Sequence, residues 1–199
     1  MINAREQLRQ LIEQRCLCTG REFTLSTGEK SNFYFDCKRA TLVGEALALI
    51  ADLFLEEIDK LTVPLQAIGG LTMGADFITA AVIMRAYQTG RPVVHGSIAR
   101  KEPKKHGTMN KVENELPRGT NIIVVDDVVT SGSSIIKACY EFEHEGYKVV
   151  GILAVVDREQ GGIEKLRERY GHAVALFKAS EFPALVEFQR RATHKAAAA

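Results

Sequence analysis

The sequence predicts an α/β fold with a central, mainly parallel sheet flanked by helices. Segments of strand length alternate with segments of helical period, and polar loops follow the strand-like segments. Two of those segments, 121–127 (NIIVVDD) and 149–157 (VVGILAVVD), are almost continuously apolar, which is typical of strands buried on both faces. With 199 residues the chain can form one such domain with a small N-terminal addition.

The individual elements follow from hydrophobic spacing and from turn residues. Apolar positions three and four apart predict helices, and Gly90, Pro92 and Gly146 predict where two of them end. The expected elements are a helix at 43–60, a strand at 66–70, a helix at 75–87, a strand at 93–99, a polar loop at 100–116, a strand at 121–127, a turn and helix at 131–146 and a strand at 149–157. Ligands of such a sheet bind beyond the carboxyl ends of its strands.

The composition argues against several classes of function. Hydrophobic residues make up 46% and charged residues 26% of the chain, and a formal net charge of +1 gives no reason to expect nucleic acid or a membrane surface as partner. The N-terminal segment mixes acidic and basic residues, unlike a signal peptide, and no apolar stretch has the length of a membrane span. The four cysteines do not complete a zinc pattern, so we expect reduced thiols, a cytoplasmic protein and no metal ligands of its own.

The segment 124–134 has a pattern typical of a sugar-phosphate site. A buried strand ends in Asp126 and Asp127, and a loop of small hydroxylated residues then opens a helix. Unpaired N–H groups at a helix start suit a phosphate, while the carboxylates can accept hydrogen bonds from ribose hydroxyls. The loop has neither the Gly-Lys-Ser/Thr ending of a P-loop nor three spaced glycines. The alternative is that the acids cap the helix and the hydroxylated residues only turn the chain.

The segment 100–111 is strongly basic for a chain of net charge +1. It holds five Lys or Arg residues against one Glu, and it directly follows an expected strand. That position places it at the ligand edge of the sheet, where cations on a closing loop can stabilise charge on a leaving group. The alternative is a solvated charge run.

Four motifs together resemble the orotate branch of the type I phosphoribosyltransferases. The segment 124–134 resembles their signature for phosphoribosyl pyrophosphate, and Arg-Lys-Glu-Pro-Lys-Lys-His-Gly at 100–107 resembles their catalytic loop. Phe-Thr-Leu-Ser-Thr-Gly-Glu-Lys-Ser-Asn-Phe-Tyr-Phe-Asp at 23–36 is similar to their hood, which covers the base, and Asp-Arg-Glu at 157–159 ends a strand as theirs does. The resemblance implies a helix and hood at 1–40, a phosphoribosyltransferase core at 41–191 and a tail at 192–199.

The resemblance also implies roles for individual residues. The catalytic residues would be Lys104, Asp126 and Asp127. Phosphoribosyl pyrophosphate would be bound by Arg100, Lys101, Lys104, His106, Asp126, Asp127, Val128, Val129, Thr130, Ser131, Gly132, Ser133 and Ser134. Orotate would be bound by Tyr34, Phe35, Thr130 and Arg158. Without the resemblance, the aromatic residues would be read as core packing and Arg158 as a surface residue paired with Glu159.

The implied reaction transfers ribose 5-phosphate from phosphoribosyl pyrophosphate to orotate, giving orotidine 5′-monophosphate and pyrophosphate in pyrimidine synthesis. Mg²⁺ is expected to arrive with the substrate, and a homodimer in which subunits share the basic loop is implied. The alternatives are a purine phosphoribosyltransferase and a non-catalytic regulator that binds phosphoribosyl pyrophosphate. Ser26 and Gly70-Leu71-Thr72 depart from the commoner pattern, so pyrophosphate contacts are expected on backbone amides around Gly69 and Gly70.

Overall fold

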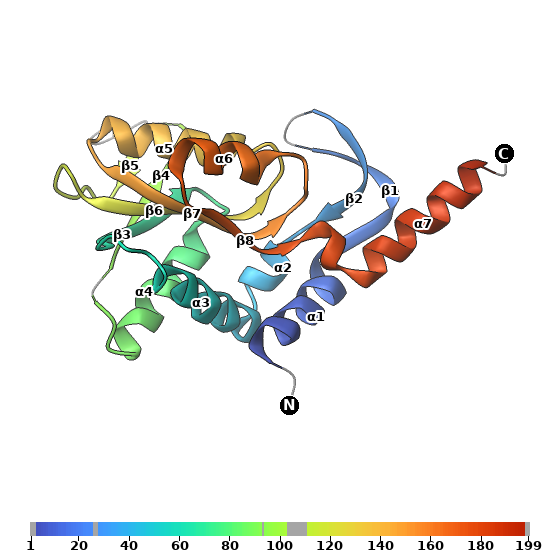
Figure 1. Cartoon of the computed structure of the whole chain (residues 1–199), viewed down its shortest axis with the longest axis horizontal. Coiled ribbons are helices and arrows are strands. Elements are labelled where there is room, and N and C mark those ends of the chain that lie inside the picture. The colour runs from blue at the N-terminus through green and yellow to red at the C-terminus, as the bar shows by residue number, and fades with distance from the viewer. Residues whose placement is uncertain (1–2, 26–27, 93, 103–110, 198–199) are drawn as a thin grey trace.

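A six-stranded sheet forms the centre of the protein in a computed structural model that describes residues 3–25, 28–92, 94–102 and 111–197 (Figure 1). The strand order is β5-β4-β3-β6-β7-β8, and all neighbours are parallel except the edge pair β4–β5. The strands of this sheet are β3 (Ala67–Leu71), β4 (His95–Ala99), β5 (Val112–Glu113), β6 (Asn121–Val129), β7 (Lys148–Asp157) and β8 (Ala173–Lys178). The predicted α/β class with a mainly parallel sheet is confirmed.

Helices cover both faces of this sheet. Figure 1 shows α3 and α4 on one face and α5 and α6 on the other. Their bounds are α3 (Gly44–Ile58), α4 (Asp76–Gln88), α5 (Ser133–His144) and α6 (Gly162–Tyr170). Alternate residues of β6 therefore enter different cores: Ile123 and Val125 pack on the α3–α4 side, and Ile122 and Val124 on the α5–α6 side. This two-sided burial is why the strand is continuously apolar until it reaches its acids.

The remaining elements form a second layer beside the sheet. An antiparallel hairpin of β1 (Leu17–Thr24) and β2 (Lys30–Phe35), here called the hood hairpin, lies next to the terminal helices (Figure 1). These helices are α1 (Ala4–Cys16), the short α2 (Lys38–Thr41) and α7 (Pro183–Ala197), with the 3-10 turn η1 (Ala179–Glu181) before α7. α7 extends outward from the body and crosses the tail boundary that the sequence analysis places at residue 192. No helix in the described part of the chain combines the length and apolarity of a membrane span.

Two features of the core differ from the sequence-based expectation. The segment 100–116, expected to be loop throughout, contains the two-residue strand β5, which returns antiparallel to β4 and pairs Val112 with Ala99. The strand β6 continues to Val129, two residues past the predicted end, because its pairing with β7 persists as far as Val129 and Asp157. Asp126 and Asp127 consequently lie inside a paired strand rather than in the loop that follows.

The strand order creates a switch point between β3 and β6. The chain leaves β3 toward β4 on one side, and leaves β6 toward β7 on the other. The loops that follow these two neighbouring strands therefore diverge and leave a crevice at their carboxyl ends, where ligands bind in open α/β sheets.

Candidate active site

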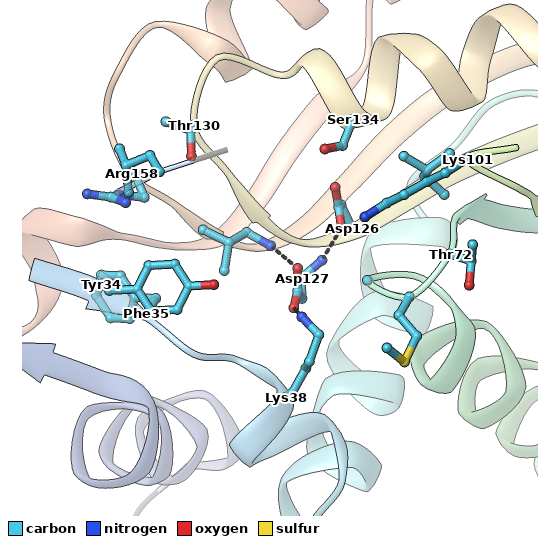
Figure 2. Close-up of a pocket in the computed structure, with 15 residues that line it drawn as sticks. Tyr34, Phe35, Lys38, Thr72, Lys101, Asp126, Asp127, Thr130, Ser134 and Arg158 are labelled. Atoms are coloured by element: carbon cyan, nitrogen blue, oxygen red, sulfur yellow. Dashed lines mark hydrogen bonds and ion pairs between the residues drawn. The ribbon is translucent and has the colours of Figure 1, made fainter. Parts of the chain in front are cut away.

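A cavity of ≈ 280 Å³ lies at this switch point, between the ends of β3 and β6 and the hood hairpin (Figure 2). Five charged side chains from four different segments give it both signs of charge, and apolar and hydroxylated residues complete its wall. The lining residues are Leu25, Tyr34, Phe35, Lys38, Leu71, Thr72, Met73, Gly74, Lys101, Asp126, Asp127, Val128, Thr130, Ser134 and Arg158.

The acid pair Asp126–Asp127 forms the floor of the cavity. The Asp127 N–H donates to Asp126 Oδ1 and the Val128 N–H donates to Asp127 Oδ1, both at 2.9 Å. Neither acid caps a helix, because α5 begins after Gly132, which contributes no side-chain cap. The capping alternative is therefore wrong. Burial, and then the neighbouring Asp127, raise the pKa of Asp126 well above its ordinary value, since both disfavour a second negative charge here.

The turn after β3 packs directly against these acids. A Cβ on Gly74 would overlap Asp126 Oδ1 and crowd Asp127 Oδ1, so only glycine allows this approach. The Thr72 hydroxyl donates to Asp76 Oδ1 at 2.9 Å, which ties the turn to the first residue of α4. The Gly69 and Gly70 amides, where we expected pyrophosphate contacts, lie within buried β3, and the cavity is lined instead by residues 71–74.

The hydroxylated loop after β6 encloses a smaller hollow of ≈ 20 Å³ beside the main cavity. Gly132 adopts a left-handed conformation (φ 79°) immediately before α5, and the Ile136 N–H donates to its carbonyl at 2.9 Å. The loop therefore presents the start of α5, with its unpaired N–H groups, to this hollow. The predicted phosphate residues gather here: Asp126, Val128, Val129, Thr130, Ser131, Gly132, Ser133 and Ser134 line it.

Arg158 follows β7 and is buried, with 4% of its surface exposed. Its Nη2 donates to Ser31 Oγ at 2.9 Å and to the Phe33 carbonyl at 3.3 Å, and its guanidinium lies 4.4 Å from the centre of the Phe33 ring. The neighbouring Glu159 accepts from Ser180 instead, so the surface-pair alternative for Arg158 is wrong. Arg158 Nε is buried without a partner at the cavity wall, where an anionic ligand can satisfy it.

The aromatic residues of β2 separate because strand side chains alternate. Tyr34 is 37% exposed and stacks on Phe23 with ring centroids 5.7 Å apart. Phe35 is 2% exposed and packs on Phe182, with centroids 5.0 Å apart. Both contribute to the cavity wall, but Phe35 is mainly a core residue and only Tyr34 offers an accessible ring edge (Figure 2).

The predicted basic loop is only partly described. Lys101 lines the cavity, whereas Arg100 forms an ion pair with Glu113 on β5 at 3.2 Å. Lys104 and His106 lie outside the described residues. The backbone N–H of Arg100 donates to the Lys111 carbonyl at 2.7 Å, which joins the two ends of the loop.

Lys38 is a lining residue that the sequence analysis missed. It begins α2, directly after the hood hairpin, and its Nζ lies 3.5 Å from Asp127 Oδ2 (Figure 2). The nearby Asp127 carboxylate raises the pKa of this lysine. The only sequence signal for Lys38 is its position two residues after Asp36, the last residue of the hood motif. No spacing pattern in the sequence connects Lys38 with Asp127.

The fold and the pocket together are typical of one class of protein, and comparison with known proteins indicates the same class. A family model for the phosphoribosyl transferase domain matches residues 67–187, which include β3, the acid pair, the phosphate loop and Arg158. The chain belongs to the phosphoribosyltransferase family.

Sequence relatives narrow the family to one branch. The chain is 40% identical over 161 residues to the orotate phosphoribosyltransferase of Leptospira biflexa, covering 80% of this chain and 86% of the relative. It is 38% identical over 179 residues to that of Aquifex aeolicus, covering 89% and 96%. The crystal structure of Mycobacterium tuberculosis orotate phosphoribosyltransferase in complex with Fe(III) dicitrate superposes with a TM-score of 0.76 at 29% identity, covering 91% of this chain and 99% of that one. Within the family, the chain belongs with the orotate phosphoribosyltransferases.

Proposed function

We propose that this protein transfers ribose 5-phosphate from phosphoribosyl pyrophosphate to orotate, forming orotidine 5′-monophosphate and pyrophosphate in pyrimidine synthesis. One structural observation carries the proposal: the acid pair, the phosphate loop and a buried arginine with an unpartnered Nε share one cavity. These groups match the ribose, the 5′-phosphate and the orotate carboxylate. The orotate phosphoribosyltransferase relatives support the same reaction.

The reaction is a displacement at the anomeric carbon of the ribose. A ring nitrogen of orotate forms the new bond as the bond to pyrophosphate breaks. The leaving pyrophosphate keeps the electron pair of the broken bond, and the proton of the ring nitrogen is released to solvent. Positive charge develops on the ribose, and Asp126 and Asp127 favour it while accepting hydrogen bonds from the ribose hydroxyls. The loop 130–134 holds the 5′-phosphate, so positioning and electrostatics provide most of the rate.

Pyrophosphate departs with charge that cations must balance. Lys101 lines the cavity, which supports a role in balancing the charge of the pyrophosphate. The sequence resemblance assigns the same role to Lys104, Arg100 and His106. The described residues contain no group of three or more His, Cys, Asp or Glu that could hold a metal. The carboxylates of Asp126 and Asp127 provide the hard oxygen atoms that suit Mg²⁺, and magnesium bound with the substrate would neutralise the pyrophosphate.

The selection of orotate rests on Arg158, Tyr34, Phe35 and Thr130. A guanidinium can meet the orotate carboxylate or a ring carbonyl, and a half-exposed tyrosine can pack on a flat pyrimidine. A purine lacks the carboxylate and would leave Arg158 Nε unsatisfied, which disfavours purine substrates.

The proposal also includes a homodimer whose subunits share the basic loop. It places the protein in the cytoplasm. The dimer rests on the sequence resemblance of residues 100–107, and the compartment on the cysteines, since Cys16, Cys18, Cys37 and Cys139 are all free.

The test follows orotate consumption by ultraviolet absorbance in the presence of phosphoribosyl pyrophosphate and magnesium. We expect turnover with orotate and none when adenine or hypoxanthine replaces it, measured as pyrophosphate release. Tight binding of phosphoribosyl pyrophosphate without turnover of orotate would contradict the proposal and favour a regulator.

A further inference from the structure

Lys38 is a cation at the active-site cavity that the proposed reaction does not use. It lies on α2, which is neither part of the hood hairpin nor part of the sheet, and its side chain is 41% exposed. Figure 2 shows it rising from below the acid pair, on the side of the cavity opposite Thr130 and Ser134. Its partner is Asp127, 89 positions later in the chain.

The ion pair with Lys38 gives the second oxygen of the Asp127 carboxylate a partner. Oδ1 accepts from the Val128 N–H at 2.9 Å, a bond made within its own strand. Oδ2 faces Lys38 Nζ at 3.5 Å, so the second oxygen is oriented from a different segment. Gly74 closes the third side, because the Asp127 side chain has little room to turn toward it. The carboxylate plane is thereby fixed before any substrate enters.

The groups around the Asp127 carboxylate are mostly acidic, so Lys38 is important for balancing their charge. Asp126 lies beside this carboxylate on β6, and Asp36, Tyr34 and Cys37 approach from the hood side. The lining residues of the β3 turn and of the phosphate loop carry no ionisable group. Among the described residues, Lys38 is the cation that forms an ion pair with Asp127. Its charge also lowers the pKa of Asp126, against the larger effects of burial and of Asp127, which raise it.

We propose that Lys38 is a positioning residue that holds the Asp127 carboxylate oriented toward the ribose of phosphoribosyl pyrophosphate. The inference rests on the proposed function, because it deepens the role of the acid pair in that site. The carboxylate can accept hydrogen bonds from the ribose hydroxyls only when its oxygen atoms face them, so its orientation matters for binding. Lys38 therefore acts through Asp127 and governs binding of the ribosyl donor rather than of orotate.

The test measures binding of phosphoribosyl pyrophosphate with magnesium by calorimetry, without orotate. The variants are Lys38→Met, which removes the charge at similar length, Lys38→Arg, which keeps it, Asp127→Asn, and the double variant Lys38→Met with Asp127→Asn. Lys60→Met is the matched control, since Lys60 pairs with Glu57 at 2.6 Å on the surface, far from the cavity lining. A thermal melt of each variant verifies its folding, and Lys38→Gln replaces Lys38→Met if the latter does not fold.

The expected losses follow from the contact between Lys38 and Asp127. Without the lysine, Asp127 Oδ2 loses its partner from α2, and the carboxylate can turn away from the ribose. We expect Lys38→Met to weaken binding about tenfold, the size typical of a lost contact to a charged group. Lys38→Arg should stay within about threefold of wild type and Lys60→Met should equal it. The double variant should bind no more weakly than Asp127→Asn alone.

Three results would overturn the inference. Binding by Lys38→Met equal to wild type removes the role altogether. A loss that adds to that of Asp127→Asn indicates direct contact with the substrate instead. Binding by Lys38→Arg as weak as that of Lys38→Met would show that the cation beside Asp127 is not what matters. The measurement omits orotate, so failure to turn over orotate contradicts the proposed function without affecting this result.

Discussion

The two sides of the cavity are built in different ways. On the sheet side, the acid pair and the phosphate loop are consecutive residues, 126–134, held by β6 and the start of α5. On the hood side, the polar contacts of the cavity join distant segments: Arg158 reaches Ser31 across 127 positions, and Lys38 reaches Asp127. The sheet side is set by one local motif, and the hood side depends on the packing of the whole molecule.

This difference separates the two substrates. The groups proposed for the ribose and the 5′-phosphate belong to the sheet edge, whereas Arg158, Tyr34 and Phe35, proposed for orotate, lie between the hood hairpin and the end of β7. Thr130 of the phosphate loop is the one residue proposed for both. Changes on the sheet side should therefore affect the chemical step and the donor. Changes at Arg158 and its contacts with the hood hairpin should mainly affect affinity for orotate, whereas Lys38 acts on the donor through Asp127. The following variants test that division.

The largest effect is expected for Asp126→Asn, which removes charge from the sheet side. We expect kcat to fall about 10²–10³-fold, because the charge that favours the developing cation is lost. The pKa of Asp126 is raised in the folded protein, so stability falls as pH rises above the ordinary value of 3.8, because the carboxyl of the unfolded chain ionises first. The variant should thus gain on the order of 1 kcal/mol at neutral pH, measured by urea unfolding. Asp59→Asn, at an exposed ion pair with Arg91, is the control and should change neither quantity much.

A comparable loss is expected for Lys104→Ala in the basic loop. Removing a cation that stabilises the leaving pyrophosphate should lower kcat about 10²-fold, while the neighbouring Lys105→Ala should change it less than about twofold. Steady-state turnover of orotate measures both. Equal effects of the two substitutions would mean that the loop acts only through its overall charge.

A smaller effect is expected for Gly74→Ala, which changes the packing against the acid pair without changing any charge. The added Cβ must displace Asp126, so kcat/KM for the donor should fall about tenfold or more. Gly44→Ala is the matched control, because a Cβ there meets no atom within 4 Å. A loss confined to the KM of orotate would break the proposed division between the two sides.

The smallest effect is expected for Ser31→Ala on the hood side. It removes one hydrogen bond to the Arg158 guanidinium, so the KM of orotate should rise about fivefold while the KM of the donor stays unchanged. Ser31→Thr keeps the hydroxyl and should restore most of the affinity. A rise in both KM values would show that the hood and the sheet edge are not separate in function.

The same difference explains how much the sequence could predict. The strand, the two acids and the loop of 121–134 are contiguous, so their pattern was sufficient to predict the fold class and a phosphate site. Lys38 could not be found because its partner lies on another element and no periodicity links them. The extension of β6 to Val129 was missed because strand pairing with β7, rather than local propensity, sets its end. The helix α6 and the strand β8 were not predicted at all, although β8 forms one edge of the sheet and α6 packs on β7 and β8.

The short strand β5 has a consequence for the basic loop above it. Its pairing with β4, together with the bond between the Arg100 N–H and the Lys111 carbonyl, closes the loop at its base. Once the base is closed, doubling the number of residues in the loop costs only about 0.6 kcal/mol in chain entropy. Length and composition of the loop can therefore diverge in evolution, or be altered in the laboratory, while the sheet beneath keeps its stability.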